Sequence, residues 1–154
     1  MGDGLVLATI DTDGKVTTSP VVPIDTGGGL PTELCWLSVT PDDRWVYATN
    51  FGYGYLTSYR IEGNVLSIAK DPACPKVAGD GTFRALNNTV SSGPSDNWLS
   101  PDGAFLYQIY GNASKLVGYA CPPTARSRRS RVRTSPTTAL RASPASEPFG
   151  RRHA

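Results

Sequence analysis

Short apolar runs separated by polar turns dominate the first 120 residues of the chain. Gly, Pro, Asp and Asn stand between the runs and favour tight turns. No apolar stripe of 3.6-residue period continues for ten residues, which argues against a helical fold. In the middle of the chain the pattern predicts four successive antiparallel strands, at 35–40, 44–50, 55–61 and 65–69.

The sequence repeats itself with an offset of 60 residues. The segment PDDRWVYATNFGYGYLTSY, which begins at Pro41, aligns without a gap with PDGAFLYQIYGNASKLVGY, which begins at Pro101. Upstream, Trp36-Leu37-Ser38 matches Trp98-Leu99-Ser100 only after an adjustment of two residues. Internal repetition is typical of stacked supersecondary units.

The second copy predicts three strands, and a hairpin precedes the first copy. We therefore predict an all-β fold, a partial β-propeller of about two and a half four-stranded antiparallel blades. A seven-stranded sandwich is the alternative, but it leaves the gap-free offset unexplained. The predicted parts are a blade remnant at 1–30, a blade at 31–93 that includes a long loop at 70–93, and an incomplete blade at 94–120.

Charge separates the end of the chain from the rest. Residues 1–120 carry seven Lys and Arg against twelve Asp and Glu, whereas residues 121–154 carry eight Arg against Glu147 alone. The rear segment is rich in Arg, Ser and Pro and has too few apolar residues for a core, so we expect it to be disordered. Its arginines lack a nearby aromatic stacking partner, and we expect salt-sensitive adhesion without a specific nucleic-acid partner.

Cysteine and histidine content argues against a metal or redox centre. Cys35, Cys74 and Cys121 show no C-x-x-C spacing and the single histidine is His153, so we expect no metal and no cofactor. A disulfide between Cys35 and Cys74 requires an exported parent protein, and we favour two buried free thiols. No long apolar run or signal-peptide pattern is present, so we expect no membrane partner and leave the compartment open between cytoplasm and secretion.

Two segments resemble the lactonase-type seven-bladed β-propellers, the family that contains 6-phosphogluconolactonase and carboxymuconate cyclase. They are CWLSVTPDDRWVYATN, which begins at Cys35, and GPSDNWLSPDGAFLYQIYGNASKLVGY, which begins at Gly93. The SPDG turn, the Phe-Leu-Tyr that follows it and the preceding Gly-Pro-Ser-Asp occur in the order that this family shows. The resemblance covers roughly residues 5–120 and implies the C-terminal part of such a protein, with about the first four blades absent.

The resemblance also implies that Tyr119 is followed by an Asp-Gly-Ser-Leu turn and a last outer strand. Residues 121–154 contain neither. Synonymous codons for residues 120–147, translated from the third base of the Ala120 codon, permit both features before a stop codon. We therefore interpret residues 121–154 as the product of a frameshift.

The resemblance implies a parent protein that acts on, or binds, a small polar metabolite such as a sugar lactone or a carboxymuconate-type lactone. The resemblance implies an acid, a histidine and arginines around the central channel, where arginine can bind an anionic group and a general base can activate water. Here Trp36 and Ser38 stand where Glu-x-His is expected, and Ser95 stands where an arginine is expected. Because a channel forms only when all blades close the ring, we expect this chain to be inactive alone. The alternatives are a non-catalytic binding or scaffold propeller and a basic-tailed nucleic-acid binder.

Five residues are the candidates for a site. Glu33 and Asp96 are the acids nearest the predicted channel and are the catalytic candidates, although Asp96 is expected to cap a turn and Glu33 can equally lie in a solvated loop. Trp36, Asn97 and Trp98 are candidate ligand contacts, although we expect both tryptophans to pack between blades. Because two and a half blades leave blade edges exposed, we also expect self-association through those edges.

Overall fold

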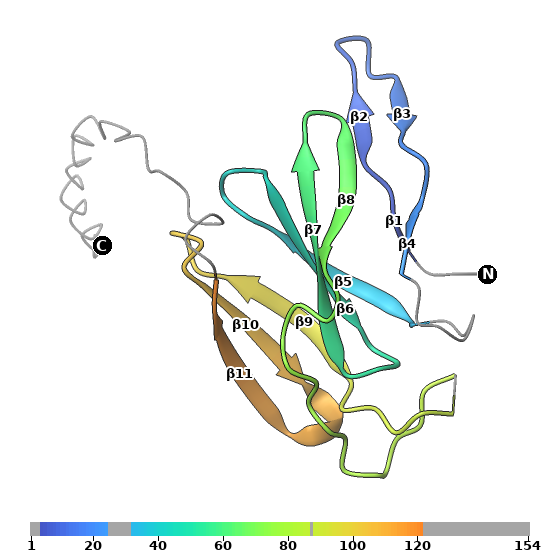
Figure 1. The fold of residues 1–154 in the computed structure, drawn as a ribbon, viewed down its shortest axis with the longest axis vertical. Helices are drawn as coiled ribbons and strands as arrows, with labels where there is room; N and C mark the ends of the chain where they lie inside the picture. The colour runs from blue at the N-terminus through green and yellow to red at the C-terminus, as the bar shows by residue number, and fades with distance from the viewer. Residues whose placement is uncertain (1–3, 25–31, 87, 122–154) are drawn as a thin grey trace, which may run out of the picture.

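Figure 1 shows a chain built from short antiparallel strands, described over residues 4–24, 32–86 and 88–121 of the computed structural model. The strands of this part form small sheets of two to four strands that do not close on themselves, which confirms the predicted all-β class. The one helical element among these residues is the short 3₁₀ turn η1, Gly111–Ala113. The strands are β1 (Gly4–Leu5), β2 (Ala8–Ile10), β3 (Val16–Thr18), β4 (Val22–Pro23), β5 (Leu34–Val39), β6 (Trp45–Asn50), β7 (Tyr55–Glu62), β8 (Val65–Lys70), β9 (Pro94–Leu99), β10 (Phe105–Tyr110) and β11 (Lys115–Ala120).

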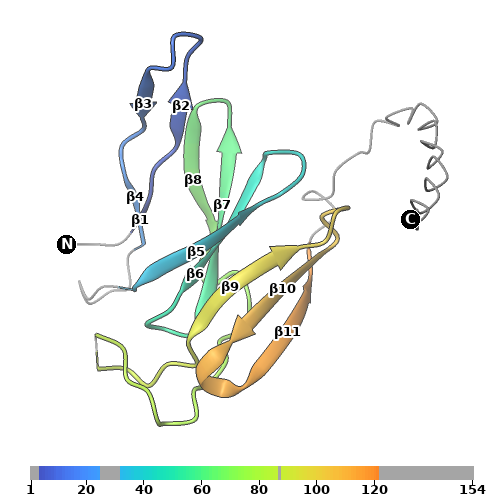
Figure 2. The same ribbon diagram turned by 180° about the vertical axis from the view of Figure 1, so that it is seen from behind.

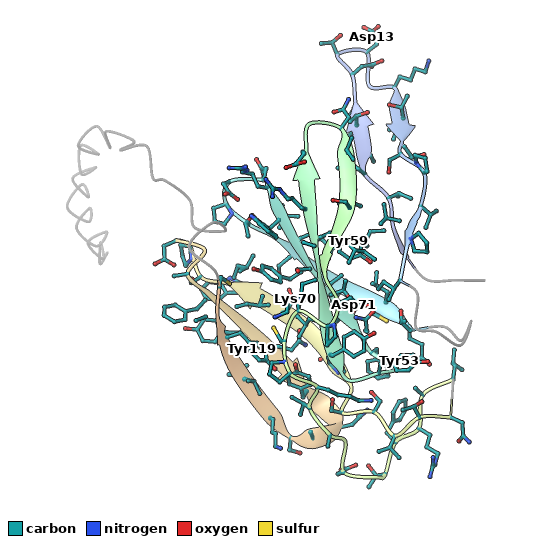
Figure 3. The ribbon with its side chains drawn as sticks, viewed as in Figure 1. Asp13, Tyr53, Tyr59, Lys70, Asp71 and Tyr119 are labelled. Atoms are coloured by element: carbon teal, nitrogen blue, oxygen red, sulfur yellow. The ribbon has the colours of Figure 1, made fainter. Side chains whose placement is uncertain are left out.

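The first four strands make one interrupted hairpin, as the pattern predicts. β1 pairs with β4 and β2 pairs with β3. Between the two pairs, the Leu7 amide donates to the Ser19 hydroxyl at 3.0 Å, and the Ser19 amide donates to the Leu7 carbonyl at 2.8 Å. At the tip, the Asp11 carboxylate accepts a hydrogen bond from the Lys15 amide at 2.8 Å. These bonds continue the hairpin across its interruption, and Figure 3 shows Asp13 at the tip.

The central sheet has the strand order β5-β6-β7-β8, with each strand antiparallel to its neighbour. Side chains alternate between the two faces of a strand, so β6 sends Tyr47 to one core and Val46 and Ala48 to another. The first core joins the central sheet to the three-stranded sheet β9-β10-β11, and the second joins it to the hairpin. The central sheet is therefore covered on both faces, which explains why β6 is almost wholly buried.

The 60-residue repeat reappears in the strand register. Val46 pairs with Tyr59, and Leu106 pairs with Tyr119 at the same offset. The first strands of the two sheets, β5 and β9, are called the inner strands. They follow the same rule, since Leu37 pairs with Ala48 and Asn97 pairs with Gln108. The two-residue adjustment inferred from the sequence is therefore wrong. The turn after each inner strand sets the register, and the tryptophans do not.

Equivalent side-chain hydrogen bonds close the two turns that follow the inner strands. The Thr40 hydroxyl donates to the Asp42 carboxylate at 2.6 Å and accepts from the Trp45 amide at 3.0 Å. In the second copy, the Ser100 hydroxyl donates to the Asp102 carboxylate at 2.7 Å. It also accepts a hydrogen bond from the Phe105 amide at 2.9 Å. A hydroxyl two residues before an Asp thus fixes both turns.

Both inner strands carry a bulge at equivalent places, but different side chains satisfy its backbone groups. In β5 the Thr49 hydroxyl accepts from the Trp36 amide at 3.0 Å and lies 3.3 Å from the Trp36 carbonyl. In β9 the Gln108 side-chain amide donates to the carbonyls of Ser95 and Asp96, at 3.1 and 3.2 Å. Because buried backbone groups need partners, each bulge requires such a polar side chain.

The long loop after β8 returns to the central sheet. The Ala73 amide donates to the Leu56 carbonyl at 2.6 Å, and the Val77 amide donates to the Gly54 carbonyl at 3.0 Å. Gly54 has a φ of +74°, and a Cβ there would lie 2.8 Å from the Val77 carbonyl oxygen. The loop thus approaches the turn between β6 and β7 closely enough to require glycine.

Residues 122–154 lie outside the described residues. The disorder and the frameshift origin that the sequence predicts for this segment therefore stay predictions. Within the described ranges, no helix is long and apolar enough to cross a membrane.

The carboxylate at the second turn provides a test of the repeated hydrogen bonds. Replacing Asp102 with Ala removes the acceptor of the Ser100 hydroxyl and of the Ala104 amide. We expect the free energy of unfolding to fall by about 1 to 3 kcal/mol. Asp13→Ala is the control, because Asp13 is exposed at the hairpin tip, and its effect should stay within about 0.5 kcal/mol. Urea unfolding followed by tryptophan fluorescence measures both, and equal effects would contradict the prediction.

Two leucines at equivalent places in the repeat test the burial of the central sheet. Leu56 is completely buried, whereas Leu116, 60 residues later, is 69% exposed. Leu56→Ala should lower the free energy of unfolding by about 2 to 5 kcal/mol, or unfold the chain outright. Leu116→Ala should change it by no more than about 0.5 kcal/mol. The measurement is urea unfolding at a low protein concentration, and a Leu116→Ala variant as unstable as Leu56→Ala would show that the last sheet is covered.

Candidate functional site

The two inner strands, β5 and β9, lie side by side although 59 residues separate their contacting side chains (Figure 2). The Ser38 hydroxyl donates to the Asn97 side-chain oxygen and lies 3.2 Å from the Asn97 carbonyl oxygen. Asn97 is almost fully buried, and its side-chain nitrogen has no partner among the described residues. This polar contact connects the central sheet to the last sheet at the inner strands.

Asp96 and Trp98 line a small hollow on the exposed face of the last sheet. The hollow has a volume of about 100 Å³ and includes Tyr107, whose ring centroid lies 5.8 Å from that of Trp98. Trp98 is 57% exposed, and no described sheet packs against it. The register explains this exposure, because Trp98 is equivalent to Ser38, and no described element covers the face on which it lies.

Asp96 does not cap a turn, contrary to the expectation from sequence. It lies in the bulge of β9, its side chain is exposed, and none of the described residues donates a hydrogen bond to its carboxylate. The carboxylates that close the equivalent turns are Asp42 and Asp102, which directly follow the inner strands. Asp96 therefore remains open to solvent and to a ligand.

Glu33 contacts the long loop and Trp36 contacts the turn between β6 and β7, and neither residue lines the hollow that contains Asp96. The Glu33 carboxylate accepts a hydrogen bond from the Leu86 amide, and its carbonyl accepts one from the Phe51 amide at 3.1 Å. The Trp36 ring lies 6.3 Å from the Phe51 ring, which in turn lies 5.4 Å from that of Phe83. Trp36 thus packs against its own sheet's turn and not between sheets. The five candidates are divided between two places.

A larger cavity lies between the central sheet and the last sheet, at a place where the sequence indicated no site. It has a volume of about 360 Å³, and Figure 3 shows two of its residues, Lys70 and Tyr119, beside the boundary of the two sheets. Cys74 and Cys121 also line it. Burial, with a smaller contribution from Cys121, raises the pKa of the Cys74 thiol to about 11. Cys74 is therefore protonated at neutral pH and a poor nucleophile.

All three cysteines are present as thiols, but the expectation that Cys35 is buried is wrong. Cys35 lies exposed in the bulged part of β5, where its Sγ donates to the Glu33 carbonyl at 3.1 Å. Cys74 is half-buried in the loop after β8 and Cys121 is buried after β11. Only the backbone path of the loop brings Cys74 near Cys121, and no sequence pattern indicates it.

A chain of buried polar groups also escaped the sequence analysis. The Asn50 side-chain amide donates to the Thr57 hydroxyl at 2.8 Å, and that hydroxyl donates to the Asp71 carboxylate at 2.7 Å. Burial, and to a smaller extent Asp71, raises the pKa of Tyr55 to about 12. This chain anchors the start of the loop to β6 and β7.

The chemistry that the hollow can perform is limited. Its one ionisable acid is Asp96, and none of its lining residues is a cation that could bind an anionic ligand. The nearest described arginine by sequence, Arg84, donates instead to the Asn88 carbonyl at 2.9 Å. Over the described ranges no group of His, Cys, Asp and Glu could hold a metal ion. Ligand pockets usually measure about 300 to 1,000 Å³, so this hollow is at most one wall of a site.

Comparison of the chain with protein-family models, with curated proteins and with solved structures finds no match.

Proposed function

We propose that this chain is part of a lactonase-type β-propeller, and that the complete protein binds a small polar lactone in a channel lined by its inner strands. The observation that supports this most strongly is the repeat of register, turn and bulge at an offset of 60 residues. A β-sandwich gives no reason for two successive sheets to repeat all three features. Sheets that are repeated in this way and packed face to face are the building principle of propellers.

The placement of polar groups on the inner strands supports a channel site. Asp96 carries a solvent-accessible carboxylate, and the neighbouring Asn97 has a buried side-chain nitrogen without a described partner. A carboxylate near neutral amide groups can accept hydrogen bonds from the hydroxyls of a sugar lactone and can serve as general base for water. We assign Asp96 this role in the complete protein.

This chain alone should not hydrolyse a lactone. The hollow offers no arginine for a carboxylate or phosphate group and no histidine for proton transfer. The missing groups would have to come from further blades of the parent, which the resemblance implies. In the alternative, a binding or scaffold propeller, the further blades would not supply these catalytic groups.

The test uses the complete gene, with the frame restored after codon 120 and any upstream blades included. We expect the purified protein to bind and hydrolyse 6-phosphogluconolactone or a carboxymuconolactone, measured by calorimetry and by acid release. Asp96→Asn should lower kcat by about 100-fold or more, as expected for loss of a general base. Asp13→Asn, at the exposed hairpin tip, is the matched control and should leave kcat unchanged.

The possible outcomes separate the alternatives. Lactone binding without turnover would favour the non-catalytic binding module. Absence of binding to both lactones by a folded, complete protein would refute the proposal. Activity that survives Asp96→Asn would move the general base to another blade and remove the role assigned to Asp96.

A further inference from the structure

Apolar faces are exposed at both ends of the described fold. At one end, the last sheet presents the C-face, which consists of Trp98, Phe105, Tyr107, Ile109 and Leu116. At the other end, the hairpin presents the N-face, which consists of Val6, Ile10 and Val16. Leu116 and Ile10 are the most exposed of these residues, at 69% and 70%. Single exposed apolar residues are common, but two such groups at opposite ends require a physical explanation.

The internal repeat shows what kind of surface the C-face is. Its residues Phe105, Tyr107 and Leu116 are equivalent to Trp45, Tyr47 and Leu56 of the central sheet. In the central sheet these positions pack against the next sheet, and Leu56 is completely buried there. The C-face is therefore the same packing surface one repeat later, where no described sheet follows.

The N-face is the other half of the same type of interface. Along residues 4–10, which run through β1 and β2, alternate residues point to opposite faces of the hairpin. Leu5 and Leu7 pack into the core shared with the central sheet, whereas Val6 and Ile10 point away from it. Val16 pairs with Ile10 across the hairpin and extends this outward face. The hairpin thus covers the sheet that follows it and exposes the side that would receive a sheet preceding it.

We propose that copies of this chain associate head to tail, with the C-face of one copy packed against the N-face of the next. The contact continues the stacking already present within each copy, where every sheet covers the face of its neighbour. Residues 122–154, which the structure does not describe, contain Val132, Leu140 and Phe149 as their only large apolar side chains. This inference depends on the described faces alone and does not require the proposed lactone chemistry.

Head-to-tail contact differs in kind from pairing through strand edges. The outer edge of β11 has no described strand beside it, and two such edges could pair symmetrically. A symmetric pairing closes at two copies and does not involve the hairpin. A contact between two different faces leaves one face free on each terminal copy, so it produces rings or open chains whose size grows with concentration.

The experiment uses the 154-residue chain and two variants, Leu116→Asp in the C-face and Ile10→Asp in the N-face. Light scattering after size exclusion should show that the mass of the unchanged chain rises about twofold or more with concentration. Each variant alone should remain monomeric. The introduced charge blocks one of its two faces on every copy, so no intact C-face can meet an intact N-face. Mixed in equal amounts, the two variants should form a dimer and nothing larger, because one intact C-face meets one intact N-face.

Val65→Asp is the matched control, because Val65 is also an exposed apolar residue but lies in β8, outside both faces. It should associate as the unchanged chain does. Recovery of a dimer in the mixture also proves that both variants are folded. A chain that stays monomeric at every concentration, an Ile10→Asp variant that still associates, or a mixture that stays monomeric while circular dichroism shows folded variants would overturn the proposal.

Discussion

The packing of sheet against sheet is the constraint on which the rest of this structure depends. The central sheet has an apolar side chain on both faces at nearly every step of β6, and neither face can be exposed without a large loss of buried area. Tyr47 and Leu56 require a sheet on one side, and Val46 and Tyr59 require the hairpin on the other. Neighbouring units therefore stabilise one another, and no single unit has a core of its own.

This dependence also explains why the inner strands meet. Once the first core brings the two sheets together, β5 and β9 lie close enough for Ser38 to contact Asn97. Polar groups at that contact are positioned by apolar packing several residues away along the strands. A propeller of the proposed kind would use this arrangement to hold ligand-binding groups on rigid strands, while their identity varies without cost to the core.

Much of the fold could be predicted from the sequence, because its signals are local. The turns after the inner strands depend on a hydroxyl and an Asp two residues apart, and both are visible at Thr40-Pro41-Asp42 and Ser100-Pro101-Asp102. The site was harder, because it depends on register. Trp36 and Trp98 look equivalent in sequence, yet the bulge and the turn place Trp98 opposite Tyr107 and make it equivalent to Ser38. Cys74 reaches its cavity through a loop whose path no short pattern encodes.

Different side chains satisfy the backbone groups of the bulges in β5 and β9. This difference limits which strands can be exchanged between the two sheets. In the central sheet the hydroxyl comes from Thr49, on the face that packs against β9–β11. In the last sheet the amide comes from Gln108, whose position is equivalent to Ala48 on the opposite face. A chimera that exchanged β6 for β10 alone would place a large buried amide where alanine fits and isoleucine where a hydroxyl is needed. The first and second strands of each sheet are therefore coupled, and an exchange between the two sheets has to replace both strands together.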